Sequence, residues 1–321
     1  MCLYSRLLKN KKYLPSKKNG GNAPVCHDKR VEYVPVKCGR CIECRKQKKR
    51  EWIVRLSEEI RTDNKAYFIT LTFNDKSFKE IKRKLLIREN ESYDEMNLIA
   101  TYAVRHWLEL IRKYKKKSIK HWLITELGED FGRIHIHGIV WCTLSDLEKW
   151  KYGYWYKGDY VNEKTINYIT KYMLKVPEKH KEFIGKILCS KGIGANYMKR
   201  EDAKNNVYKG KLTNENYRMK NGAKVNLPSY YRNKIYNEEE KEKLWIDKIE
   251  KGYRYVMGEK VSTNNIEEWE NLIRYYQDRA KLIYGENPVD WDLEKEKKKR
   301  IRLQKWLIKQ RKLLKTKKNS E

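Results

Sequence analysis

The sequence predicts an α+β fold in which a central antiparallel sheet carries helices on one face. Three patterns support this prediction. Residues 133–141 alternate apolar and polar side chains with a period of two, as a half-buried β-strand does. The apolar run 122–125 precedes this strand, and the turn-rich residues 127–132 would fold the two as antiparallel neighbours. Residues 102–117 and 165–176 instead repeat apolar side chains at helical spacing.

The composition points to a nucleic-acid partner. The chain has 321 residues, and 74 Lys and Arg against 43 Asp and Glu give it a formal net charge of +31. A charge of this sign and size favours a polyanion, and nucleic acid before a membrane. Ten Trp and 12% aromatic residues exclude a disordered basic tail and suit stacking on unpaired bases. No run of 18 apolar residues and no apolar leader is present, so we expect an intracellular protein without membrane contact.

The amino-terminal region, which is otherwise irregular, holds a cysteine series. Seven cysteines without an export signal indicate reduced thiols or metal ligands rather than disulfides. Two-residue spacers let successive thiolates converge on one ion, which predicts a closed structural Zn²⁺ site. The predicted ligands are Cys26, Cys38, Cys41 and Cys44. His27 and Cys2 are alternatives for the place of Cys26, and unligated reduced cysteines are the alternative to a metal site.

The following elements are expected in chain order. Residues 45–62 form an amphipathic helix, 66–73 a strand beside the histidine-containing one, and 76–96 a surface excursion. After the hairpin, residues 155–160 add an edge strand. Helices then cover one face of the sheet, and the open face is the expected active site.

The second half of the chain is less informative. Residues 189–194 contain two glycines whose backbone N–H groups could hold a phosphate. Residues 293–318 hold thirteen Lys and Arg with leucines at helical spacing, which predicts either a solvated basic helix or a DNA-contacting arm. We expect four parts: a cysteine-containing segment and helix (1–62), a catalytic core (63–178), a basic and aromatic extension (179–236) and a basic helical carboxy-terminal region (237–321).

Two histidines form the first candidate site. His135 and His137 are two residues apart on the predicted strand, so both side chains point to the same face. Glu126 ends the preceding apolar run, and the hairpin brings it close to the pair. Two imidazoles and a carboxylate are candidate ligands of one divalent cation. The alternative interpretation is that the histidines are merely polar residues of a half-buried strand.

Two tyrosines form the second candidate site. Tyr168 and Tyr172 are four residues apart on a predicted helix that ends at Pro177, with Lys171 and Lys175 beside them. A phenol with a pKa near 10 is a poor nucleophile unless a cation or base favours its deprotonation, and lysines and a metal would supply this. With 24 tyrosines in the chain, the spacing could also arise by chance.

Together these motifs resemble the HUH endonucleases, and more narrowly the rolling-circle replication initiators of small single-stranded DNA phages of the microvirus (gokushovirus) type. Residues 69–73 resemble the first family motif, Glu126 with 135–137 the second, and 168–172 the two-tyrosine third. The resemblance extends to 38–45 and 190–194 and weakens past about residue 240.

The resemblance implies an RRM-like nuclease core that nicks and joins DNA through a covalent 5′-phosphotyrosine. Tyr168 or Tyr172 would attack, Lys171 would stabilise phosphate charge, and His135, His137 and Glu126 would hold Mn²⁺ or Mg²⁺. Lys175, Arg133 and Lys191 are expected DNA contacts. The expected partners are single-stranded origin DNA, a host helicase and a DNA polymerase, in the cytoplasm of a bacterial host.

Two other functions remain open at this point. A transposase or plasmid relaxase of the HUH class would share every catalytic residue and would differ in its DNA target. A noncatalytic zinc-containing nucleic-acid-binding protein would account for the charge, the aromatics and the cysteines, and would leave the histidine strand and the tyrosine helix as coincidences.

Overall fold

The computed structural model describes residues 1–286 except 17–18, 89–90 and 130–131. The basic segment 293–318 therefore lies outside the described residues. The described chain forms two compact units. We call Asn64–Lys191 the sheet unit, and Met1–Asp63 together with Gly192–Glu286 the cysteine unit.

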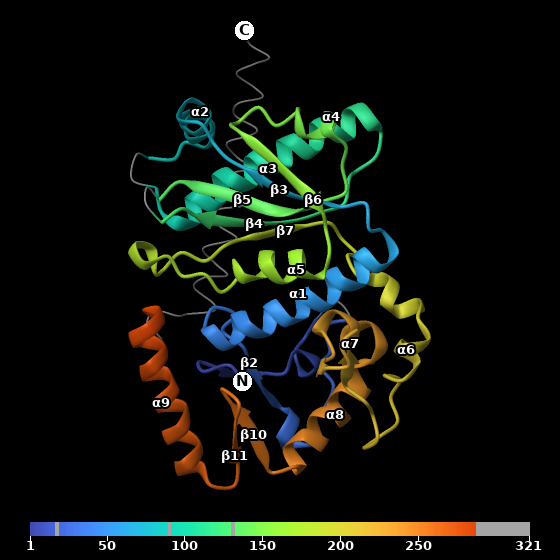
Figure 1. Ribbon diagram of the computed structural model, residues 1–321. Coiled ribbons are helices and arrows are strands. Elements are labelled where there is room, and N and C mark those ends of the chain that lie inside the picture. Colours follow the sequence, from blue (N-terminus) through green and yellow to red (C-terminus); the bar gives the residue numbers. More distant parts are fainter. Residues whose placement is uncertain (17–18, 89–90, 130–131, 287–321) are drawn as a thin grey trace. The chain divides into compact units, whose positions relative to one another are not determined.

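The sheet unit is built on one five-stranded sheet in which every neighbouring pair is antiparallel (Figure 1). The strand order is β6-β3-β5-β4-β7. The strands are β3 (Tyr67–Leu71), β4 (His121–Leu127), β5 (Ile134–Val140), β6 (Trp155–Tyr160) and β7 (Ile187–Cys189). The antiparallel sheet, the β4–β5 hairpin and the place of β3 beside β5 are confirmed.

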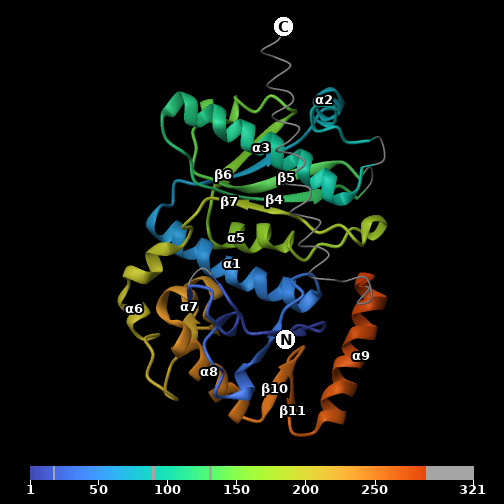
Figure 2. The same ribbon diagram turned by 180° about the vertical axis from the view of Figure 1, so that it is seen from behind.

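Helices lie on both faces of this sheet, with different roles. Figures 1 and 2 show α3 (Tyr93–Lys115) across one face and the shorter α5 (Glu163–Lys171) at the other. The excursion predicted at 76–96 contains α2 (Asp75–Leu85) and the start of α3. Helix α3 begins earlier than predicted because Ser92 and Glu95 form a capping box that satisfies its first N–H groups. The one-turn helix α4 (Leu144–Leu147) precedes β6.

The core of the sheet unit lies between the sheet and helices α2 and α3. Strand β5 places Ile134 and Ile136 in this core, so the alternate residues His135 and His137 face the opposite side. We call that side the histidine face. Gly138 follows because a Cβ there would lie 2.5 Å from the carbonyl oxygen of Trp122 on β4. The apolar alternation thus fixes which face carries the histidines.

The cysteine unit is organised along α1 (Ile42–Thr62), which begins three residues before the predicted helix. Its strand pairs are β1 (Arg6–Lys9) with β2 (Tyr33–Val36), β8 (Asn216–Arg218) with β9 (Lys224–Asn226), and β10 (Tyr253–Val256) with β11 (Glu259–Ser262). Its other α-helices are α6 (Glu201–Lys204), α7 (Ser229–Ile235), α8 (Glu238–Glu250) and α9 (Ile266–Tyr284). None of the described helices is both long and apolar enough to cross a bilayer.

Candidate active site and cysteine cluster

His137 is held by both ring nitrogens at the centre of the histidine face. It pairs in register with Thr70 on β3, and the Thr70 hydroxyl lies 3.0 Å from His137 Nδ1. His137 Nε2 lies 2.7 Å from Glu126 Oε2. A carboxylate only accepts hydrogen bonds, so Nε2 carries the proton towards Glu126, and Nδ1 of the neutral ring accepts from Thr70. The ring is therefore oriented from two neighbouring strands.

Glu126 is a buried carboxylate shared between His137 and a lysine. Lys175 Nζ lies 2.6 Å from Glu126 Oε1 and 3.3 Å from an oxygen of Glu129. Burial opposes ionisation of Glu126, but the hydrogen bonds from His137 and Lys175 outweigh it and hold the pKa of this carboxyl below its usual value. Burial likewise opposes the charge of Lys175, and its bond to Glu126 nevertheless raises its pKa. Glu126 is consequently ionised at neutral pH.

His135 lies directly opposite Glu126 in the β4–β5 register. Its ring centroid is 6.4 Å from that of His137, and a Cβ at Gly128 would come within 3.3 Å of its Cε1 atom. Burial first, and then the neighbouring His137, lower the pKa of His135. Its imidazole is therefore neutral at physiological pH, the form in which histidine binds metal ions.

These three side chains offer a suitable donor set for a divalent cation by their chemistry. Their ligand atoms are not gathered around one point, however. In the described part of the chain, the only group of three or more His, Cys, Asp or Glu side chains with all ligand atoms within 4.8 Å of one another is a cysteine cluster. Glu126 instead bonds to His137 and Lys175. The expected Mn²⁺ or Mg²⁺ thus rests on residue chemistry, without support from the geometry.

The tyrosine helix is shorter than predicted. Helix α5 ends at Lys171 instead of continuing to residue 176, because residues 172–174 bond three residues back in tight turns ahead of Pro177. Tyr172 is the C-cap and keeps helical dihedrals (φ −57°, ψ −23°), so Tyr168 and Tyr172 remain neighbours. Their hydroxyls are 3.0 Å apart.

Tyr172 lies against the histidine. Its ring is parallel to the His137 ring within 5°, with centroids 4.4 Å apart. Burial and the hydroxyl of Tyr168 raise the pKa of Tyr172 above its ordinary value. Tyr168 is 51% exposed. A protonated phenol needs a proton acceptor before it can attack phosphorus, and in this pair the partner hydroxyl is within hydrogen-bond distance.

The remaining predicted cations lie at different distances from this group. Lys175 contacts Glu126, whereas Arg133 forms an exposed ion pair of 3.4 Å with Asp75. Lys171 on α5 and Lys191 beyond β7 have exposed side chains. The structure therefore joins Lys175 to the histidine and carboxylate, and leaves Lys171, Arg133 and Lys191 towards solvent.

Two residues of the group were not singled out from the sequence. The first is Thr70, which orients His137. The second is Phe68, whose ring is 6.2 Å from His137 and 6.1 Å from Tyr168, in stacked and edge arrangements. The alternation of residues 66–73 indicates that 68 and 70 share a face, but the pairing of β3 with β5 that brings them to His137 is visible only in the fold.

The glycine segment is occupied by protein groups within the cysteine unit. The Gly194 N–H donates to Glu59 Oε2 at 2.6 Å, and the Ile193 carbonyl accepts from the Arg55 guanidinium at 3.0 Å. A carboxylate already bound to this N–H takes the place that a phosphate would need. The Gly194 N–H is therefore not a free donor for a phosphate.

The cysteine cluster has a different fourth member from the one predicted. Cys2, Cys38, Cys41 and Cys44 are all buried, and their sulfur atoms lie within 4.8 Å of one another. The Cys41–Cys2 and Cys38–Cys44 sulfur distances are 3.9 and 3.8 Å. The choice of Cys26 was wrong, and Cys2, one of its two rivals, takes the place. Cys26 Sγ lies 3.2 Å from the Asp28 carbonyl oxygen instead.

Strand pairing explains this exchange. Antiparallel β1 and β2 pair Arg6 with Val36, so the residues just outside this ladder also meet, and the Cys38 N–H donates to Cys2 Sγ at 3.2 Å. Cys41 is the N-cap of α1, where the helix dipole favours thiolates. Hydrogen bonds among the sulfurs lower the pKa of Cys2, Cys38 and Cys41 and raise that of Cys44. Four buried thiols so close together can bind a structural metal ion.

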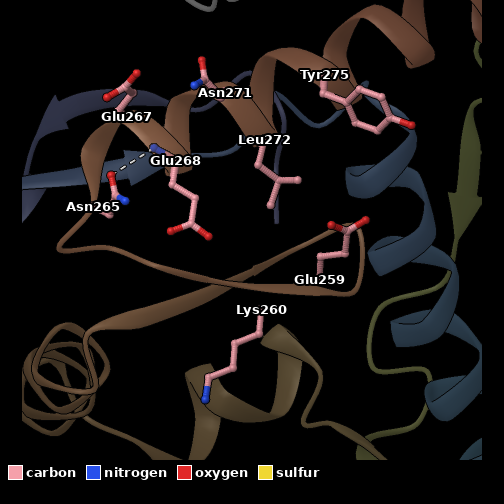
Figure 3. Close-up of a pocket in the computed structure, with 8 residues that line it drawn as sticks. All are labelled: Glu259, Lys260, Asn265, Glu267, Glu268, Asn271, Leu272 and Tyr275. Atoms are coloured by element: carbon pink, nitrogen blue, oxygen red, sulfur yellow. Dashed lines mark hydrogen bonds between the residues drawn. The ribbon is translucent and has the colours of Figure 1, made fainter.

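A hollow in the cysteine unit lacks these features. It lies between β11 and α9 (Figure 3) and is lined in part by Glu259, Glu267 and Glu268, with Lys260 as its cation. Three carboxylates disfavour a phosphate ligand. We therefore do not assign DNA contacts to this hollow.

Residues 66–177 match a family model of replication-associated proteins, the ORF2 family. The match supports a replication initiator. The matched residues run from the residue before β3 to Pro177 and contain His135, His137, Glu126 and both tyrosines. No curated protein and no solved structure matches the chain.

Proposed function

We propose that this chain initiates rolling-circle replication as an HUH endonuclease of the microvirus type, which nicks and rejoins single-stranded origin DNA. The observation that carries the proposal is the stack of Tyr172 on His137, which is itself bonded to Glu126. A nucleophile, an imidazole and a carboxylate thus meet on one face of a rigid sheet. The replication-associated family match over the same residues supports the assignment.

The reaction is a transesterification. The phenol oxygen of Tyr172 or Tyr168 forms a bond to phosphorus, and the bond from phosphorus to the 3′-oxygen breaks. The phenol proton leaves through the hydrogen bond between the two hydroxyls, and the departing 3′-oxygen takes up a proton from solvent. The products are a 5′-phosphotyrosine link and a free 3′-hydroxyl, which a host polymerase can extend while a host helicase opens the duplex.

The neighbouring side chains have separate tasks. Lys175 keeps Glu126 ionised and fixed, Thr70 orients His137, and Lys171 is available for phosphate charge. Mn²⁺ or Mg²⁺ held by His135, His137 and Glu126 would polarise the scissile phosphate. The second tyrosine permits a second transfer, in which the first phosphotyrosine link preserves the energy of the broken bond.

We also propose that the cysteine cluster binds Zn²⁺. Four thiolates form a closed tetrahedral shell without an open position, so this ion would be structural. It would link residue 2 to the start of α1 and thereby stabilise the amino-terminal segment.

A labelled adduct assay tests the nicking proposal. The full chain is incubated with Mn²⁺ and a random single-stranded oligonucleotide library, labelled at either the 5′ or the 3′ end, and separated under denaturing conditions. A 5′-phosphotyrosine retains the fragment that carries the 3′ label, so only that label should migrate with the protein. The Tyr168→Phe, Tyr172→Phe double variant is the control. DNA binding without any adduct would identify a noncatalytic nucleic-acid-binding protein.

A further inference from the structure

Two tyrosines of the edge strand β6 stand on the histidine face. Tyr156 pairs in register with Thr70, and Thr70 pairs in register with His137, so the three side chains share one face. Tyr154 continues the alternation two residues earlier, and its backbone bonds to Thr72 at 2.9 Å. The row that begins at the candidate active site therefore continues outward to a pair of phenol rings.

Both rings are open to solvent. Tyr154 is 71% exposed and Tyr156 is 52% exposed, whereas Trp155 between them packs against the core. They line a hollow of about 520 Å³ that also includes Leu144, Gly153 and Lys157. Neither ring is needed to fill the core, and each offers a broad rigid face with few torsions to immobilise on binding.

We propose that Tyr154 and Tyr156 are a stacking platform for unpaired bases of the DNA strand that enters the nicking site. The inference rests on the proposed function and names a binding surface for its substrate. Single-strand-binding proteins combine basic surfaces with aromatic rings on which successive bases stack. This chain has a net charge of +31, and Lys151 is exposed three residues before Tyr154.

The spacing agrees with a strand that passes both sites. Neighbouring strands are about 4.8 Å apart, so the two steps from β5 to β6 span about 10 Å. Stacked nucleotides rise about 3.4 Å each, so this span corresponds to about three nucleotides. Bases held by Tyr154 and Tyr156 would thus lie a few nucleotides from a phosphate at His137.

Another protein strand is the competing occupant, because β6 is an edge of the sheet. Its sequence includes Lys157, Gly158 and Asp159. Charged side chains on an edge strand oppose pairing with a further strand, and glycine weakens it. These features favour DNA over a second copy of the chain.

Binding in chelator separates this inference from catalysis. The full chain is titrated into fluorescent oligothymidine with EDTA, so that affinity is measured without cleavage. The Tyr154→Ala, Tyr156→Ala double variant should bind about tenfold more weakly or worse. The corresponding double Phe variant keeps both rings and should stay within about twofold. Tyr114→Ala, at an equally exposed tyrosine (71%) on α3, should also stay within about twofold.

Specific results would overturn the platform. Unchanged affinity in the double Ala variant, or an equal loss in the double Phe variant, would exclude stacking. A change in sedimentation mass with unchanged DNA affinity would assign the surface to self-association. If the double Ala variant is misfolded, photocrosslinking of the unsubstituted protein to iodouracil DNA decides, because crosslinks must then fall on Tyr154 or Tyr156. Failure of the adduct assay with normal stacking would remove nicking and leave this surface in place.

Discussion

The ring of Tyr172 lies parallel to the ring of His137, 4.4 Å between centroids, and links the carboxy-terminal end of α5 to the middle strand of the sheet. The contact orients a phenol beside an imidazole whose other neighbours are Thr70 and Glu126. An oriented nucleophile loses less freedom on reaching a transition state. The stack is therefore the feature to which the catalytic predictions refer.

Tyr172→Phe should abolish most initial nicking while preserving the stack, since only the hydroxyl is lost. We expect at least a hundredfold slower formation of the protein–DNA adduct, and a smaller loss for Tyr168→Phe, which lies farther from His137. Adduct formation is timed on denaturing gels with one oligonucleotide that the unsubstituted protein cleaves. Tyr160→Phe, which removes an exposed hydroxyl bonded to Tyr67, is the matched control. Normal rates in the Tyr168, Tyr172 double Phe variant would show that neither residue is the nucleophile.

Thr70→Val should weaken catalysis through His137 without removing a ligand. Partners that orient a ligating histidine typically contribute about 10- to 100-fold in metal affinity or activity. We expect the Mn²⁺ concentration for half-maximal nicking to rise by about that factor, with DNA affinity nearly unchanged because many phosphate contacts carry it. His137→Ala should instead abolish nicking at every Mn²⁺ concentration. Equal Mn²⁺ dependence in Thr70→Val and unsubstituted protein would contradict an orienting role.

Local patterns predicted much of the sheet unit. The period of two across 133–141 determines both the strand and the face of each histidine, because alternation and burial are properties of adjacent residues. The turn-rich connector likewise indicated the β4–β5 hairpin, which is observed with Glu126 opposite His135. A hairpin involves few residues and few possible registers.

Contacts between distant segments could not be predicted in this way. The pairing of Thr70 with His137 spans 67 residues, and that of Tyr156 with Thr70 depends on β6 joining the far side of β3. The selection of Cys2 over Cys26 likewise depends on the β1–β2 ladder, although Cys26 is closer in sequence. Such pairings are decided by the whole core rather than by spacing.

Asp146 should make the sheet unit sensitive to acid. Its buried carboxylate accepts hydrogen bonds from Lys115 and from the Thr143 backbone and hydroxyl. Burial opposes its ionisation, but these bonds outweigh it and lower its pKa. The stabilisation is therefore present above the unfolded pKa of about 4 and is lost as pH falls through the lower folded value.

Asp146→Asn tests this dependence. At pH 7 the free energy of unfolding should fall by about 1–3 kcal/mol, the range for hydrogen bonds to a charged group. The difference from unsubstituted protein should narrow when urea unfolding is repeated below pH 4. Asp159→Asn, at an exposed aspartate of β6, should change little at either pH. A difference that is constant with pH would mean that the carboxylate charge is not responsible.

The cysteine cluster makes a prediction that separates two cysteines of the same chain. Cys2 lies in the buried cluster, whereas Cys26 bonds to the Asp28 carbonyl outside it. Cys2→Ser should therefore reduce bound zinc well below one equivalent, and Cys26→Ser should retain it. Elemental analysis of the purified full chains measures the metal, and native thiol titration shows which cysteines it protects.

Loss of the ion should be felt locally, because the free energy of metal binding is part of the folding free energy of the segment it closes. Cys2→Ser should make residues before α1 more sensitive to limited proteolysis, while adduct formation on a short oligonucleotide falls much less than in His137→Ala. The reason is that a closed tetrathiolate shell has no position for a phosphate and cannot take part in the chemistry. Zinc-free unsubstituted protein with all seven thiols titratable in the native state would show that the cluster holds no metal, and equal zinc loss in the Cys26→Ser variant would restore Cys26 as a ligand.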